Sequence, residues 1–128
     1  MAAAAQTPPQ TMKWASAIST QPSLEAAVQE VASQAISQLG EEPDLAMVFV
    51  STAFASEYAR LLPLLRQQIQ TSPIVGCSGS GVIGMQPVQT PLEAEDQPAL
   101  SLSLAVLPGV EVTPFHLTGE ALPDLDSP

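Results

Sequence analysis

The sequence has 128 residues, enough for one domain with a modest core, and 45% of them are hydrophobic, which is too many for a disordered chain. Only 3 Lys and Arg stand against 13 Asp and Glu, and the formal net charge of −10 argues against nucleic acid and anionic membrane surfaces as partners. One cysteine and one histidine exclude an internal disulfide and a metal site rich in either residue.

Residues 1–11 have no hydrophobic periodicity and contain a Pro-Pro pair, so we expect a disordered leader, and Met12 is an alternative translation start. The Ala2–Ala5 run is too short for a signal peptide. The longest apolar run, Leu45–Val50, is far below the ~20 residues of a membrane span. These features predict a soluble cytoplasmic protein.

The first predicted elements are a strand over 14–19 and an amphipathic helix over 24–39. Ser23 is placed to cap the helix, and Gly40 to end it. Apolar residues recur at helical spacing along one face, at Leu24, Val28, Val31, Ala35 and Leu39.

A continuous apolar run over 45–50 predicts a strand buried on both faces, in the middle of a sheet. A second helix is predicted over 57–70, and Pro63 is expected to kink it or divide it in two. A glycine-rich strand and turn follow over 74–84. The polar segment 86–97 is typical of a loop or a weak edge strand.

Residues 100–106 alternate between apolar and small side chains, which predicts a strand. After the Pro108-Gly109 turn, residues 110–117 are expected to return as its hairpin partner. From 119 onward, acidic residues, proline and serine indicate a linker. The fold class is therefore α/β, in the order β-α-β-α-β and then an antiparallel hairpin. Two helices cover one face of a mixed sheet, and the other face needs a partner.

The glycine-rich stretch is the main candidate site, because its backbone N–H groups and serine hydroxyls suit a cradle for a small ligand. The alternative is a tight crossover between two strands without a ligand. Two hydroxyl residues after the 45–50 strand are second candidates, with helix capping as their alternative role. The candidate ligand-binding residues are Gly76, Cys77, Ser78, Gly79, Ser80, Gly81, Ser51 and Thr52.

Other motifs are weaker. Residues 79–84 match the letters GxGxxG, but Met85-Gln86-Pro87 follows where a dinucleotide-binding motif needs a helix, so we reject that interpretation. Cys77 and His116 form the one possible Cys–His pair, although a small buried cysteine in a turn is the favoured alternative. His116 is also a conceivable haem ligand, against the alternative of a surface histidine. No other cofactor is expected, and the carboxylates at 93, 95 and 96 lack calcium-loop spacing.

Four segments together resemble the FIST N-terminal domain family: Met-Lys-Trp-Ala-Ser-Ala at 12–17, the strand at 45–51, Gly-Cys-Ser-Gly-Ser-Gly-Val-Ile-Gly at 76–84 and Thr-Pro-Phe-His-Leu at 113–117. The resemblance is closest to the cyanobacterial-type branch. Many family members have Gly-Cys-Ser-Thr-x-Gly-Glu instead, and this chain lacks that acidic residue.

The resemblance implies a FIST N-terminal-like domain over 12–119 and a linker over 120–128 to a C-terminal FIST domain. It also implies a non-enzymatic sensory domain of intracellular signal transduction that binds a small molecule such as an amino acid, while some branches bind haem. Two other functions stay open. One is an interaction module that docks a second domain through the open sheet face, and the other is a hydrolase that uses Cys77.

Overall fold

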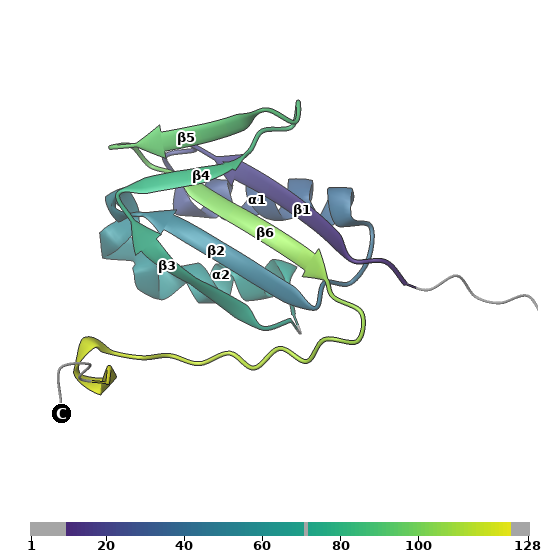
Figure 1. Ribbon diagram of the computed structural model, residues 1–128. Helices are drawn as coiled ribbons and strands as arrows, with labels where there is room; N and C mark the ends of the chain where they lie inside the picture. Colours follow the sequence, from purple (N-terminus) through teal and green to yellow (C-terminus); the bar gives the residue numbers. More distant parts are fainter. Residues whose placement is uncertain (1–9, 71, 124–128) are drawn as a thin grey trace, which may run out of the picture.

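The structure is a computed structural model that describes residues 10–70 and 72–123. Most of the predicted leader and residues 124–128 of the predicted linker lie outside the described residues. The elements run in the order β1 (Lys13–Ser19), α1 (Leu24–Leu39), β2 (Leu45–Ser51), α2 (Tyr58–Gln68), β3 (Ile74–Gly79), β4 (Gly81–Met85), β5 (Pro91–Glu95) and β6 (Leu100–Val106) (Figure 1). Short 3-10 helices span Thr52–Glu57 and Gly119–Ala121.

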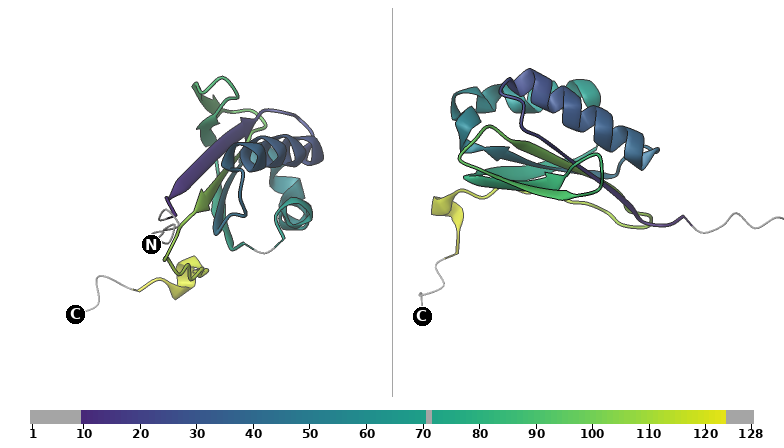
Figure 2. Two further views of the ribbon diagram at one scale, coloured as in Figure 1. Left: turned by 90° about the vertical axis from the view of Figure 1, so that its right-hand side faces the viewer. Right: turned by 90° about the horizontal axis from the view of Figure 1, so that it is seen from above.

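The main sheet has four strands in the order β1-β6-β2-β3. β6 is antiparallel to both β1 and β2, and β2 is parallel to β3. Both α-helices lie on the same side of this sheet (Figure 2). The predicted fold class, a mixed α/β sheet with two helices on one face, is confirmed.

The antiparallel hairpin exists, but it is made by other residues than predicted. β4 and β5 pair from Gly81 with Glu95 to Met85 with Pro91. β4 comes from the predicted glycine-rich strand and turn, and β5 lies in the segment 86–97, which was expected to be a loop or a weak edge strand. Residues 110–117 form no strand. The reason is that β6 already pairs with β1 on one side and β2 on the other, so it has no free edge for a return strand.

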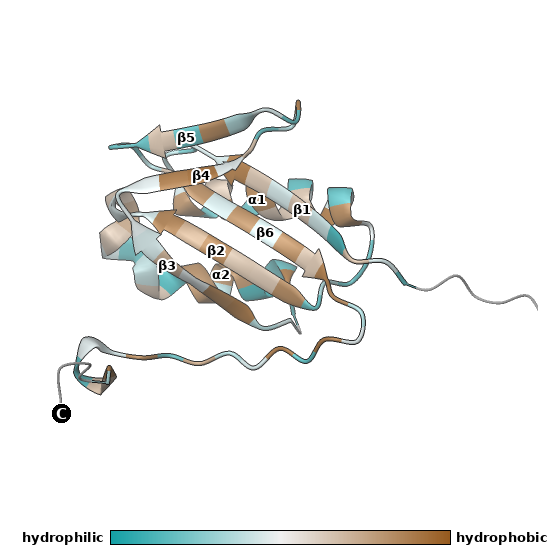
Figure 3. Cartoon of the chain, viewed as in Figure 1, coloured by the Kyte–Doolittle hydropathy of each residue, from teal (hydrophilic) through white to brown (hydrophobic). Residues whose placement is uncertain are grey.

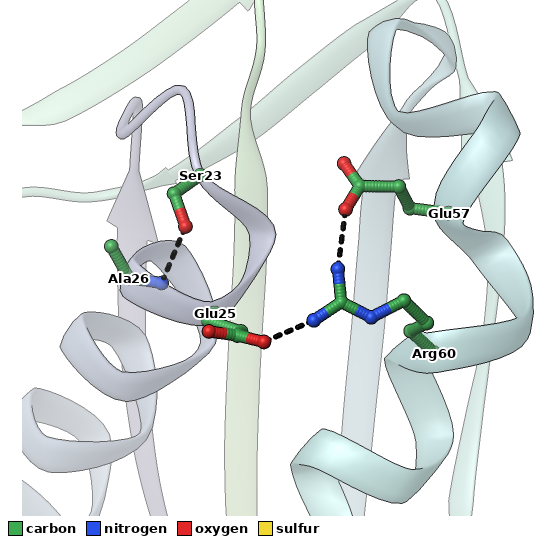
Figure 4. Close-up of polar contacts among 5 residues, drawn as sticks. All are labelled: Ser23, Glu25, Ala26, Glu57 and Arg60. Carbon is green, nitrogen blue, oxygen red and sulfur yellow. Dashed lines mark hydrogen bonds and ion pairs between the residues drawn. The ribbon is translucent and has the colours of Figure 1, made fainter.

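Helix α1 begins and ends where the sequence predicts. Ser23 Oγ accepts a hydrogen bond from the Ala26 amide at 3.3 Å (Figure 4). At the other end, Gly40 has a φ of +71°, and its N–H donates to the Ile36 carbonyl at 3.0 Å. Glycine adopts this left-handed conformation at the lowest cost, so the helix stops there. The predicted apolar face is confirmed, since Leu24, Val28, Val31, Ala35 and Leu39 are each at most 3% exposed.

β2 lies inside the sheet, as predicted, but only one of its faces is buried. Ala46, Val48 and Val50 belong to the core beneath the helices, whereas Phe49 on the opposite face is 36% exposed. β6 alternates in hydropathy, as its brown and pale bands in Figure 3 show, but it is buried on both faces, with only Ser103 partly exposed. Burial of β2 on both faces was therefore a wrong prediction, because α1 and α2 both cover the same side of the sheet.

Helix α2 continues through Pro63, so the expected division at this residue is wrong. Pro63 is exposed, while Leu61 and Leu65 on either side are buried. This packing holds the helix together although the proline lacks a backbone donor. The irregular turn comes earlier, at the buried Phe54, whose φ of −95° and ψ of 15° are not helical.

The β4–β5 hairpin covers part of the face opposite the helices. Its buried residues join β1 in a small second core made of Ile18, Val82, Ala94 and Ala99. Gly84 makes the close crossing possible, because a Cβ on it would lie only 2.6 Å from the Cβ of Ile18. The rest of this face stays open, with Trp14 51% exposed.

Candidate functional site

Ser51 and Thr52, the two hydroxyl residues predicted as second candidates, lie where the parallel strands β2 and β3 end. Ser51 and Gly79 are neighbours in register at these carboxyl ends. Ser51 is buried, and its hydroxyl donates to the Gln97 carbonyl at 2.7 Å and accepts from the Ala53 amide at 3.1 Å. The bond from Ala53 is the predicted cap of the 3-10 helix, and the bond to Gln97 holds β2 to the segment before β6. Thr52 is exposed on the first turn of the 3-10 helix.

The glycine-rich stretch forms β3, a bend at Ser80, and β4. A Cβ on Gly76 would lie 1.7 Å from the Val48 carbonyl oxygen, so glycine is required because β2 approaches so closely. Together with Gly84, it serves the tight strand packing that was the alternative to a ligand cradle. The GxGxxG letters lead into strand β4, and no helix opens there, consistent with our rejection of a dinucleotide motif.

A cavity of about 240 Å³ lies between α2 and the neighbouring strands β2 and β3. Three predicted binding residues line it, namely Gly76, Cys77 and Ser78. Its other lining residues are Val48, Val50, Tyr58, Leu61 and Leu62. The remaining predicted residues do not line it: Gly79, Ser80, Gly81, Ser51 and Thr52. The structure therefore brings together the first half of the glycine-rich stretch and an apolar helix face.

Tyr58 is the cavity residue that the sequence reasoning missed. Its hydroxyl oxygen is buried, and among the described residues it has no hydrogen-bond partner. Buried tyrosine hydroxyls usually have one, and an unpaired one costs about 1–3 kcal/mol. The sequence did contain a signal for this residue, because the chain's one tyrosine lies on the apolar side of a predicted helix. The ring at such a position packs inward, and its hydroxyl then needs a hydrogen-bond partner.

Cys77 is exposed on strand β3, in register with Phe49, so a buried cysteine in a turn is a wrong prediction. It lies on a sheet edge because β3 pairs only with β2. His116 is exposed on the irregular segment that follows β6. Within the described ranges, the Cys77 thiol has no hydrogen bond to His116 or to another side chain, so this pair lacks the contact that would activate a nucleophile.

The surroundings of His116 do not fit a haem. A hollow of about 530 Å³ lies between this segment and β3, with Leu62, Ile74 and Phe115 among its lining residues. Phe115 is 82% exposed, so the wall beside the histidine does not enclose an apolar group as a haem pocket does.

A larger hollow of about 550 Å³ lies at the carboxyl end of β6, and acidic residues border it. Two of its carboxylates hold structural contacts: Glu41 pairs with Lys13, and Asp44 Oδ2 accepts from the Leu107 amide at 2.7 Å. In the described part of the chain, no group of three or more His, Cys, Asp or Glu is arranged to hold a metal ion. We therefore place the candidate site at the 240 Å³ cavity.

None of the helices in residues 10–70 and 72–123 is long and apolar enough to cross a membrane. The model of the FIST N domain family matches residues 44–121, which is more than half of the chain and includes every residue that lines the cavity. No curated protein matches the chain. The match includes the resembling segments at 45–51, 76–84 and 113–117, whereas the segment at 12–17 lies before it. The chain thus belongs to the FIST N domain family, whose members generally serve as sensory domains of signal transduction proteins.

Proposed function

We propose that this chain is a non-enzymatic sensory domain of intracellular, cytoplasmic signal transduction that binds a small molecule in the cavity beside α2. The observation that carries the proposal is the cavity itself, in which Gly76, Cys77 and Ser78 of the glycine-rich stretch face apolar side chains of α2. Apolar walls with a few polar groups from one strand are the usual composition of a small-molecule site.

The size of the cavity limits the ligand. Drug-sized ligands occupy pockets of about 300–1,000 Å³, and this cavity has about 240 Å³. We therefore expect a metabolite no larger than an amino acid. The lining residues support a binding role over catalysis, because none of them is a histidine, carboxylate or lysine that would serve as a general acid or base.

Thermal unfolding followed through Trp14 tests the proposal, with a panel of small metabolites added to the protein. A ligand at ~100 times its dissociation constant stabilises the folded state by about 2.7 kcal/mol, a shift of several degrees. Two variants make a matched pair. Ser78→Leu adds bulk at a residue that lines the cavity, and Ser80→Leu adds the same bulk at an exposed bend outside it.

We expect Ser78→Leu to abolish the ligand-induced shift and Ser80→Leu to retain it. Equal loss in both variants would place binding elsewhere on the glycine-rich stretch. A panel that shifts neither the native chain nor either variant would count against a ligand-binding role.

A second candidate function, docking of another domain, is favoured by the open face of the sheet. Two large apolar side chains on strands of the main sheet are exposed on this face, Trp14 at 51% and Phe49 at 36%. The resemblance implies a C-terminal FIST domain as the occupant. This role is tested with a protein in which such a C-terminal domain follows the present sequence. Sedimentation compares its compactness with that of its Trp14→Ser and Phe49→Ser variants, which we expect to be less compact. Compaction that both substitutions leave intact would exclude this face.

A further inference from the structure

Strand β3 has a free edge in the main sheet. Among the described strands it pairs only with β2. The Ala46 amide donates to the Pro73 carbonyl at 2.9 Å, and alternate residues of a parallel ladder point their backbone groups to the same neighbour. The N–H and C=O groups of residues 74, 76 and 78 therefore face away from β2. Such a row of backbone donors and acceptors is a template for a further strand.

The segment 110–117 passes this edge as an extended chain. None of residues 111–117 makes a hydrogen bond with another described residue. The hollow of about 530 Å³ lies between the segment and β3, with Ile74 on one side and Phe115 on the other. Three large apolar side chains of the segment are exposed, those of Val110, Phe115 and Leu117. Each of them would gain free energy from burial.

The course of the chain gives this segment the direction of β3. β6 is antiparallel to β2, which is parallel to β3. A turn closed by a hydrogen bond of 3.2 Å from the Val110 amide to the Leu107 carbonyl reverses the chain after β6. The segment then runs in the same direction as β3 (Figure 1). It would therefore join the free edge as a parallel strand, in the order β1-β6-β2-β3-segment.

A proline determines which residues of the segment can face β3. Pro114 has no N–H group, and on an edge strand a proline points its nitrogen to solvent. Alternation then directs the backbone groups of Thr113, Phe115 and Leu117 to the free edge. Thr113 also favours an extended conformation, because it precedes the proline.

The same alternation places the side chains. A residue that faces its neighbour in a parallel ladder bonds to the residues on either side of its own partner, so odd-numbered residues of the segment would pair with odd-numbered residues of β3. Cys77 is in register with Phe49, on the face opposite the helices. Phe115 and Leu117 would lie on that face, and the two valines of the segment would lie on the other, on the side of the exposed Leu62 of α2.

We propose that the free edge of β3 is a docking surface for the chain's own residues 110–117, which close on it as a parallel edge strand. The segment is a better occupant than a second copy of the chain, because it is already tethered beside the edge and its effective concentration there is high. Docking takes place next to the candidate site, since Leu62 and Gly76 line both the hollow and the 240 Å³ cavity. It needs no ligand, so it holds whether or not the cavity binds one.

Amide hydrogen exchange of the 128-residue chain, followed by NMR and corrected for intrinsic rates, tests this pairing. We expect the amides of Thr113, Phe115 and Leu117 to exchange at least about tenfold more slowly than those of Val112 and His116. The reason is that the first three would donate to β3, whereas the other two would face solvent.

The chain's one cysteine allows a second test, of the faces of the strand. Leu117→Cys and His116→Cys each add one thiol at an exposed position, on opposite faces of the proposed strand. Phe115→Cys covers a register shifted by two residues. In a glutathione redox buffer, we expect Cys77 to form an intramolecular disulfide at least about tenfold more favourably in Leu117→Cys or Phe115→Cys than in His116→Cys, because Cβ vectors that point apart cannot be bridged.

Two results would overturn the inference. If the amides of 111–117 lack alternating protection, or if the three cysteine variants form the disulfide equally well, the segment does not pair with β3. If the amides of residues 76 and 78 are protected only at high protein concentration while 111–117 stay unprotected, a second copy occupies the edge instead.

Discussion

Replacement of Gly84 by alanine tests whether the β4–β5 hairpin lies as close to β1 as the structure places it. The new Cβ would be 2.6 Å from the Cβ of Ile18 and 3.2 Å from both the Ala17 carbonyl oxygen and the Ser101 Cβ. Carbon atoms pack at roughly 3.5–4.0 Å, so β4 has to retreat by about 1 Å. None of the three neighbouring atoms is the far end of a flexible side chain, and none can rotate away.

The expected loss of stability follows from two opposing effects. Overpacking a close contact costs typically about 1–3 kcal/mol, and this contact is short enough for the upper part of that range. Alanine in a strand recovers roughly 0.5–1 kcal/mol of backbone entropy relative to glycine. We therefore expect Gly84→Ala to lower the free energy of unfolding by about 2 kcal/mol.

Urea unfolding monitored by Trp14 fluorescence measures this difference, since Trp14 is the chain's one tryptophan. Gly119→Ala is the matched control, because nothing lies within 4 Å of its added Cβ, and we expect a change within about 0.5 kcal/mol. Gly76→Ala should be the most damaging, since its Cβ would lie 1.7 Å from the Val48 carbonyl oxygen. If Gly84→Ala is as stable as Gly119→Ala, the hairpin does not cross β1 at this distance and the reasoning fails.

Further outcomes follow from single polar contacts, each measured by the same unfolding assay. Ser51→Ala should cost about 1–2 kcal/mol because it leaves the Gln97 carbonyl without its hydroxyl donor; no loss would mean that water replaces the hydroxyl. Ser23→Ala removes the cap of α1 and should cost about 1 kcal/mol, with Ser23→Asp as a variant that preserves it. Arg60→Gln should cost less than about 1 kcal/mol, and the difference should shrink at high salt, because its two ion pairs are largely exposed. Without ligand, Tyr58→Phe should leave stability unchanged or raise it, whereas a loss of more than about 1 kcal/mol would reveal a partner for the hydroxyl.

Features that depend on neighbouring residues along the chain were predictable from the sequence. The cap at Ser23, the stop at Gly40 and the buried face of α1 need only helical spacing and local backbone preferences. The alternation along residues 100–106 also identified a strand without tertiary information. The glycine-rich stretch was recognised as unusual for the same reason, since glycine at this density signals close backbone approach.

Other features depend on which strands become neighbours, and a one-dimensional pattern does not contain that information. Residues 110–117 alternate like a strand, yet both edges of β6 are already paired, so the alternation has no edge of β6 to join. The cavity is likewise a tertiary product, because its walls come from β2, α2 and β3. In the sequence, Tyr58 is one more apolar position of a helix. Only the packing of α2 against the sheet buries its hydroxyl without a partner among the described residues, because burial depends on what the fold brings near and not on the residues adjacent in the chain.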